Sequence, residues 1–180
     1  MRDRLLKLTI AVAMSSLSLA VERDLESEVA AAASQDNITA LSETYPRING
    51  NKTLTIEVKL RSCLRILDVT VRYLTANPNR PKDAFMNVAP PDGRYRPGIA
   101  PEDIDDPVIR AKYVDMLKEN NIARDKSNRW VRAGNLKSSV ERYVRAVVTN
   151  DPTLLDKDGI KDLWLKLPEE TRKELQTRKP

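Results

Sequence analysis

The stretch from Pro78 to Pro107, PNRPKDAFMNVAPPDGRYRPGIAPEDIDDP, decides how the chain is divided. It holds seven of the eleven prolines, with Gly93 and Gly98 among them. Proline lacks an amide proton and biases the residue before it away from helix, so the stretch predicts an extended connector. A connector of this length suggests a linker, or a strap that lies across a partner surface. The apolar residues that would make the contacts of such a strap are Phe85, Met86, Val88, Tyr95 and Ile99.

Before the connector, the sequence favours helix in two segments. Residues 24–43 are good helix formers with an alanine run, and Tyr45-Pro46 followed by Ile48-Asn49-Gly50-Asn51 predicts a turn. In residues 53–74 the first apolar side chains alternate as in a strand and also fall at helical spacing. A segment of this length without Gly or Pro favours a helix, and residues 53–60 stay open between strand and helix.

The sequence after the connector also favours helices. Asp106 is a good N-cap and Pro107 a good first helical residue. Glu141 and Arg145 lie four residues apart, a spacing at which they are expected to pair. Asn150-Asp151-Pro152 predicts a helix end. The expected helices are 107–117, 128–149, 159–167 and 168–177.

The first twenty residues have the layout of a secretory signal peptide. Three basic residues lie among the first seven, thirteen uncharged residues follow, and small residues precede the expected cut between Ala20 and Val21. Thirteen residues are too few to span a bilayer as a helix. We therefore expect an exported protein, periplasmic or secreted, without a transmembrane segment in the mature chain. The alternative is a cytoplasmic protein that keeps this segment as a buried helix.

The predicted fold class is mainly α, with two helical blocks joined by a long Pro-rich extended connector. The expected division of the chain is a signal peptide at 1–20, an N-terminal helical block at 21–76, a Pro-rich linker at 77–106 and a C-terminal helical block at 107–180.

The composition argues against the commoner kinds of catalysis. The chain contains no histidine, which excludes Ser-His-Asp and Cys-His arrangements and histidine-based zinc sites. Its one cysteine, Cys63, cannot form an internal disulfide, and we expect it to be buried as a small hydrophobe. No phosphate-binding or nucleophile motif is present, so the sequence predicts no catalytic residue and no cofactor. An enzyme that uses carboxylates or a lysine is the remaining alternative.

The densest acidic cluster is Glu102-Asp103-Ile104-Asp105-Asp106. Calcium sites need six to eight oxygen ligands, and such a cluster supplies some of them. The cluster also lies at an expected helix start, where carboxylates accept hydrogen bonds from free amides and meet the positive end of the helix dipole. We favour this capping interpretation and predict no metal site.

The densest basic segment lies between Arg124 and Arg145, with seven basic and two acidic residues and with Trp130 and Tyr143 among them. A basic helix with aromatic side chains can bind phosphates and stack bases. Both aromatic residues, however, fall on the apolar side of the helix, and a solvated basic face is the plainer interpretation. The candidate anion-binding residues are Arg124, Lys126, Arg129, Arg132, Lys137, Arg142 and Arg145.

Part of the sequence resembles a group of short secreted bacterial proteins of uncharacterised function. The resemblance rests on the residues 87–91, 98–104, 106–113 and 119–121, in which a VAPP…DP..R..Y…EN pattern joins two helical regions. The residues that carry it are mostly prolines, glycines and helix-start residues. The resemblance implies export and a helix–linker–helix layout, and it implies no activity, ligand or catalytic residue.

We therefore expect an exported, non-enzymatic helical protein that binds another protein or an anionic component of the cell envelope. The helix at 128–149 and the Pro-rich strap are the expected contact surfaces. Nucleic acid is a less favoured partner because the chain is expected to be exported. The alternatives are a cytoplasmic nucleic-acid-binding protein that uses the basic 124–145 helix, and an enzyme that uses carboxylates without histidine.

Overall fold

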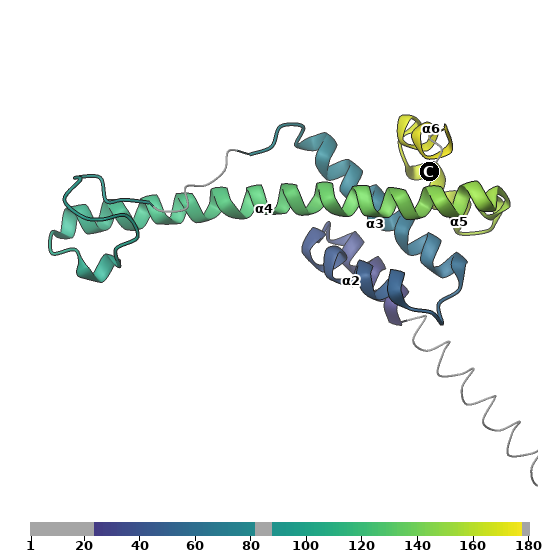
Figure 1. Ribbon diagram of the computed structural model, residues 1–180, viewed down its shortest axis with the longest axis horizontal. Helices are drawn as coiled ribbons and strands as arrows, with labels where there is room; N and C mark the ends of the chain where they lie inside the picture. The colour runs from purple at the N-terminus through teal and green to yellow at the C-terminus, as the bar shows by residue number, and fades with distance from the viewer. Residues whose placement is uncertain (1–23, 82–87, 178–180) are drawn as a thin grey trace, which may run out of the picture. The chain divides into compact units, whose positions relative to one another are not determined.

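The computed structural model describes residues 24–81 and 88–177 (Figure 1). Every regular element in these ranges is helical, which confirms the mainly α fold class. Residues 24–34 are helical. The elements that follow are α2 (Ile38–Gly50), α3 (Ile56–Ala76), the 3₁₀ helix η1 (Pro101–Asp103), α4 (Pro107–Asn150), the 3₁₀ helix η2 (Pro152–Asp156), α5 (Ile160–Lys166) and α6 (Glu169–Thr177).

Two of the sequence-based expectations fall on residues outside the described ranges. These are the signal peptide at 1–20 and the contacts of Phe85 and Met86. Among the helices that the structure does describe, none combines the length and the apolar character needed to cross a bilayer.

The chain forms two compact units. The first unit combines the chain up to Ala76 with the chain from Arg132 onward, and the second unit is Asn77–Val131. Helix α4 contributes to both, so the block 107–180 that was expected from the sequence is divided between the two units.

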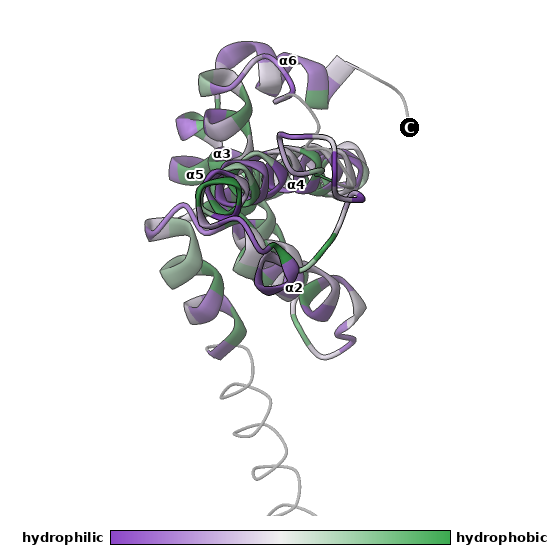
Figure 2. Cartoon of the chain, turned by 90° about the vertical axis from the view of Figure 1, so that its left-hand side faces the viewer, coloured by the Kyte–Doolittle hydropathy of each residue, from purple (hydrophilic) through white to green (hydrophobic). Residues whose placement is uncertain are grey.

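The first unit has a core built from amphipathic helices. Figure 2 shows hydrophobic and hydrophilic residues alternating along these helices, as expected where one side of a helix is buried. Burial of each large aliphatic side chain contributes about 1.5–3 kcal/mol relative to exposure. The fully buried residues include Leu41, Ile48, Leu60, Leu64, Ile66, Leu67, Val140, Val144 and Ile160.

The first turn lies at residues 35–37, inside the segment 24–43 that was predicted to be one helix. That prediction is wrong. Asp36 has a positive φ of 49°, a conformation that Asp tolerates better than most residues. Asn37 then caps α2, because its side-chain oxygen accepts a hydrogen bond from the amide of Ala40 at 3.1 Å.

Helix α2 continues through Pro46 and Gly50, the residues that predicted a turn. A proline inside a helix costs about 3 kcal/mol. Ile48 lies two residues later and is fully buried, so core packing holds the last turn in place. The turn follows the helix instead, where the side-chain oxygen of Asn51 accepts a hydrogen bond from the amide of Thr53 at 2.8 Å. The predicted turn before Gly50 is therefore wrong.

Helix α3 begins at Ile56, so the ambiguous segment 53–60 is helical from that residue onward. The hydroxyl of Thr55 accepts a hydrogen bond from the amide of Val58 at 3.3 Å, which serves as an N-cap. The prediction of a helix over most of 53–74 is confirmed.

Helix α4 is continuous over 44 residues, or about 66 Å at 1.5 Å per residue. Its start is as predicted, because the carboxylate of Asp106 accepts a hydrogen bond from the amide of Val108 at 2.8 Å. The break expected between 117 and 128 is wrong. That interval contains no Gly or Pro, and each asparagine in it costs at most about 0.7 kcal/mol relative to alanine.

The end of the chain agrees with the sequence. Helix α4 ends at Asn150, and the carboxylate of Asp151 then caps η2 by accepting a hydrogen bond from the amide of Thr153 at 3.1 Å. Helices α5 and α6 confirm the two short helices predicted at 159–167 and 168–177.

In the second unit, the connector residues 88–106 fold back on the first turns of α4. Tyr113 is fully buried, and its hydroxyl donates a hydrogen bond to the carbonyl of Val88 at 3.0 Å. The guanidinium of Arg110 donates to the carbonyl of Ile104 at 2.6 and 2.9 Å, and Ile104 is also fully buried. The connector therefore has this chain's own helix as a packing partner.

Candidate functional site

All seven basic residues of the candidate site lie on α4. A helix turns about 100° per residue, so their spacing distributes them over several sides of the helix. Arg124, Lys126 and Arg129 belong to the second unit, and the other four belong to the first. The exposed members are Arg124, Lys126, Arg129, Arg132 and Arg142.

The other two candidates, Lys137 and Arg145, are half-buried. The ammonium of Lys137 forms an ion pair with the carboxylate of Glu141 at 2.6 Å. The expected pair between Glu141 and Arg145 is therefore wrong, and the buried Nε of Arg145 has no hydrogen-bond partner within the described part of the chain. The charge of Lys137 is already compensated, so this lysine is poorly suited to bind an external anion.

The two aromatic residues of the basic segment have structural roles. The indole Nε1 of Trp130 donates a hydrogen bond to the carbonyl of Asn77 at 2.9 Å and so ties the connector to α4. Tyr143 packs against the core of the first unit, where burial raises its pKa to about 12. Both residues are partly buried and already have contacts within their own units, which makes their rings poor platforms for stacking bases.

One side of α4 in the second unit carries exposed apolar side chains together with charges. Val108, Met116 and Ile122 are exposed by 62%, 38% and 55%. At 100° per residue, these three side chains lie within a sector of about 140° around the helix axis. The same sector also contains exposed residues of both charges. We call this side the outer face of α4, and it consists of Val108, Lys112, Asp115, Met116, Glu119, Ile122, Lys126 and Arg129.

The acidic cluster at the start of α4 is only partly used for capping. Asp106 caps the helix, which confirms the capping interpretation for that residue. Glu102, Asp103 and Asp105 are exposed. Across residues 24–81 and 88–177, no group of three or more metal-ligating side chains is arranged to hold an ion.

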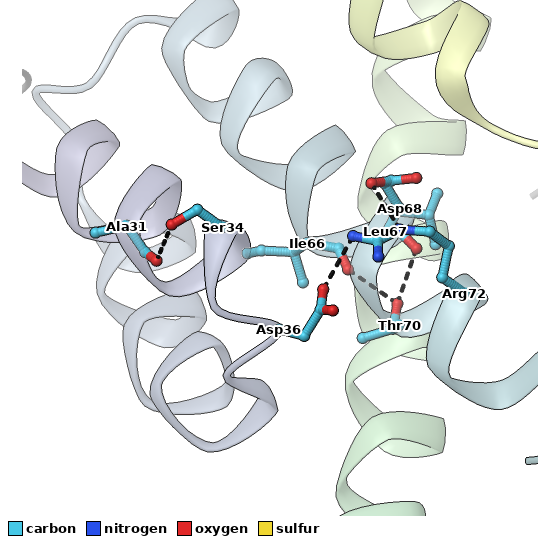
Figure 3. A network of polar contacts seen from close by, with 8 residues as sticks. All are labelled: Ala31, Ser34, Asp36, Ile66, Leu67, Asp68, Thr70 and Arg72. Carbon is cyan, nitrogen blue, oxygen red and sulfur yellow. Dashed lines mark hydrogen bonds and ion pairs between the residues drawn. The ribbon is translucent and has the colours of Figure 1, made fainter. Parts of the chain in front are cut away.

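A second feature, which the sequence analysis missed, is a shallow pocket in the first unit. Its volume is about 180 Å³, and its charged lining is formed by Arg65, Asp68, Arg72 and Lys166. Figure 3 shows the guanidinium of Arg72 reaching Asp36 at 3.0 Å and Asp68 at 3.2 Å. The spacing of 65, 68 and 72 along α3 is a signal for such a charged side of a helix.

The cations around this pocket serve mainly to join helices. Glu26 accepts hydrogen bonds from Arg61 and Arg65, each at 2.8 Å, and the bond from Arg61 is the main reason that the pKa of Glu26 is lowered. Two of the three cations that line the pocket, Arg65 and Arg72, therefore already have carboxylate partners. The pocket is a weaker candidate site than the outer face of α4.

Cys63 is buried as expected, and burial raises the pKa of its thiol to about 12. A thiol in this state carries almost no thiolate near neutral pH, and the thiolate is the reactive form. Cys63 is therefore a core residue.

Comparison with known proteins finds no matching family model, no similar curated protein and no similar solved structure.

Proposed function

We propose that the protein is an exported, non-enzymatic helical binding protein that contacts an acidic partner through the outer face of α4. The observation that carries the proposal is the exposure of Val108, Met116 and Ile122 on one side of a helix. Large apolar side chains that gather on an exposed face are typical of binding surfaces.

The charges on the outer face favour an acidic partner. Its carboxyl-terminal end carries the exposed Lys126 and Arg129, with Arg124 nearby on the same helix. The outer face itself carries three basic residues against two acidic ones. Charge complementarity of this kind steers association and determines which partners are accepted.

Three of the groups with shifted pKa values were considered as signs of a catalytic site. The lowered pKa of Glu26 has its main cause in the hydrogen bond from Arg61. The raised pKa values of Cys63 and Tyr143 have their main cause in burial. These causes are structural, so none of the three groups supports the alternative of a carboxylate enzyme.

Export is part of the proposal and rests on the layout of the first twenty residues and on the resemblance of residues 87–121 to short secreted bacterial proteins. N-terminal sequencing of the natively produced protein tests it. We expect a mature chain that begins at Val21. Recovery of intact Met1 on protein from the cytosol would contradict export.

Binding is tested by titrating the purified protein with poly-glutamate and with heparin, followed by tryptophan fluorescence. We expect the double variant Lys126→Glu with Arg129→Glu to weaken binding at least tenfold. The matched control is Lys52→Glu with Lys161→Glu, which makes the same change in net charge at exposed residues away from α4. Equal losses in both double variants would show that only net charge matters and would contradict a defined surface.

The same titration with single-stranded DNA addresses the nucleic-acid alternative. That alternative requires phosphate contacts and stacked bases, and Trp130 and Tyr143 are both engaged inside their units. We therefore expect DNA to bind no more tightly than poly-glutamate of equal charge. Clearly tighter DNA binding, weakened by Arg124→Glu, would favour the alternative.

A further inference from the structure

We infer that the acidic partner of the outer face is the same region of a second copy of this chain, so that two α4 amino-terminal halves pair antiparallel. The inference rests on the proposed function, because it names the partner of the same surface. It uses only residues of the second unit.

The order of charges along this region is the first argument. The exposed carboxylates of Glu102, Asp103 and Asp105 lie at one end, and Lys126 and Arg129 lie at the other. Met116 lies about midway along the helix, because α4 begins at Pro107, nine residues before Met116 and shortly after the exposed Asp105, and Lys126 is ten residues after Met116. A two-fold axis near Met116 therefore brings the acidic end of each copy opposite the basic end of the other.

The antiparallel arrangement is also favoured over a parallel one. In a parallel pair in register, each acidic end would meet the acidic end of its neighbour, and Lys126 would meet Lys126. Like charges brought together in this way are unfavourable. Lys112 lies four residues before Met116, and Glu119 lies three residues after it. In the antiparallel pair, Lys112 of one copy therefore lies near Glu119 of the other.

The exposed apolar residues fit the same axis. Val108 and Ile122 lie eight residues before and six residues after Met116, so Val108 of one copy comes within one helical turn of Ile122 of the other. Met116 lies close to its own counterpart. A two-fold interface of this kind uses the same surface on both copies, and all three exposed apolar side chains become covered.

A charge-swap experiment tests the inference by sedimentation equilibrium of the full mature chain. One variant carries Lys126→Glu and Arg129→Glu, and the other carries Glu102→Lys and Asp103→Lys. Asp106 is left unchanged because it caps α4. We expect a wild-type dimer, monomers for each variant alone, and dimers again in an equimolar mixture of the two variants.

Cross-linking through engineered thiols tests the axis. Met116→Cys is expected to form a disulfide-linked dimer on mild oxidation. Lys126→Cys is not, because the two positions 126 would lie about 30 Å apart along the helices. Cys63 is buried and gives no background. The mixture of Lys126→Cys with Asp105→Cys is expected to give the mixed dimer.

Three results would overturn the inference. These are a monomeric wild-type chain at high protein concentration, a mixture of swapped variants that stays monomeric, and cross-linking at 126 in preference to 116. If the chain is monomeric and still binds poly-glutamate through Lys126 and Arg129, the further inference fails and the proposed function stands. If neither self-association nor poly-glutamate binding is found, both fail.

Discussion

The two halves of α4 differ in what covers them. In the first unit, Ala133, Val140 and Val144 are fully buried in a core of several helices. In the second unit, the same helix has one fully buried residue among its described large side chains, Tyr113, and it leaves Ile122 exposed. A continuous helix can therefore serve as core at one end and as surface at the other.

The largest expected difference between the two units is in thiol reactivity. Burial raises the pKa of Cys63 from 9.0 to about 12, which lowers its thiolate fraction about a thousandfold. We expect a thiol reagent to modify Cys63 in the native wild-type protein at least a thousandfold more slowly than in urea. At protein concentrations where the chain is monomeric, a thiol introduced by Met116→Cys should react at nearly its unfolded rate. Fast modification of native Cys63 would show that the core of the first unit opens readily.

Truncation of apolar residues gives the next largest difference. Leu136 is buried in the first unit, so Leu136→Ala is expected to lower the free energy of unfolding by about 2–5 kcal/mol. Ile122→Ala is expected to change it by no more than about 0.5 kcal/mol at protein concentrations where the chain is monomeric. Urea denaturation followed by circular dichroism measures both. A large loss for Ile122→Ala would mean that the outer face is covered within one chain.

Removal of one hydroxyl tests how the connector supports the exposed half. Tyr113→Phe keeps the buried ring and removes the hydrogen bond to the carbonyl of Val88, at an expected cost of about 0.5–1.5 kcal/mol. We expect tryptic cleavage after Arg94 to become roughly two- to tenfold faster. An unchanged cleavage rate would show that the connector is held by other contacts.

The smallest expected effect is a pH dependence of the free energy of unfolding, and it arises in the first unit. The pKa of Glu26 is lowered from 4.5, chiefly by the hydrogen bond from Arg61. A carboxyl with a lower pKa in the folded state stabilises the fold above its unfolded pKa, and this contribution is lost as the pH falls through the folded pKa. At neutral pH, the free energy of unfolding of Glu26→Gln, measured by urea denaturation, should therefore be lower than that of wild type. This difference should shrink well below pH 4.5. A difference that is independent of pH would contradict an ionic role.

Local signals in the sequence predicted the parts of the fold that depend on neighbouring residues. Asp106 and Asn150-Asp151-Pro152 marked the ends of α4 correctly, because caps and proline act within one turn. The turn predicted at Pro46 is absent, because the burial of Ile48 in the core outweighs the local cost of a proline inside a helix. Tertiary packing of this kind has no local signal.

The sequence indicated the charged residues of the candidate site but not its exposed apolar residues. All seven basic residues lie on α4, although the helix predicted at 128–149 left Arg124 and Lys126 outside it. The charge pattern alone indicated these residues. The exposure of Val108 and Ile122 could not be predicted, because it depends on which side of α4 the connector covers. That choice is made by contacts such as Tyr113 with Val88, which are 25 residues apart.

The hydrogen bond from the amide of Gly98 to the carbonyl of Val88 at 3.0 Å has a practical consequence. It closes the residues between them into a loop whose two ends are held together, with exposed Gly93 far from either end. The space around Gly93 is open, because a Cβ there would meet no atom within 4 Å, and its φ of +71° requires that the glycine itself be kept. A short epitope or fluorescent tag inserted beside Gly93 should therefore leave the anchored ends intact, which gives a handle for following the protein without touching either terminus.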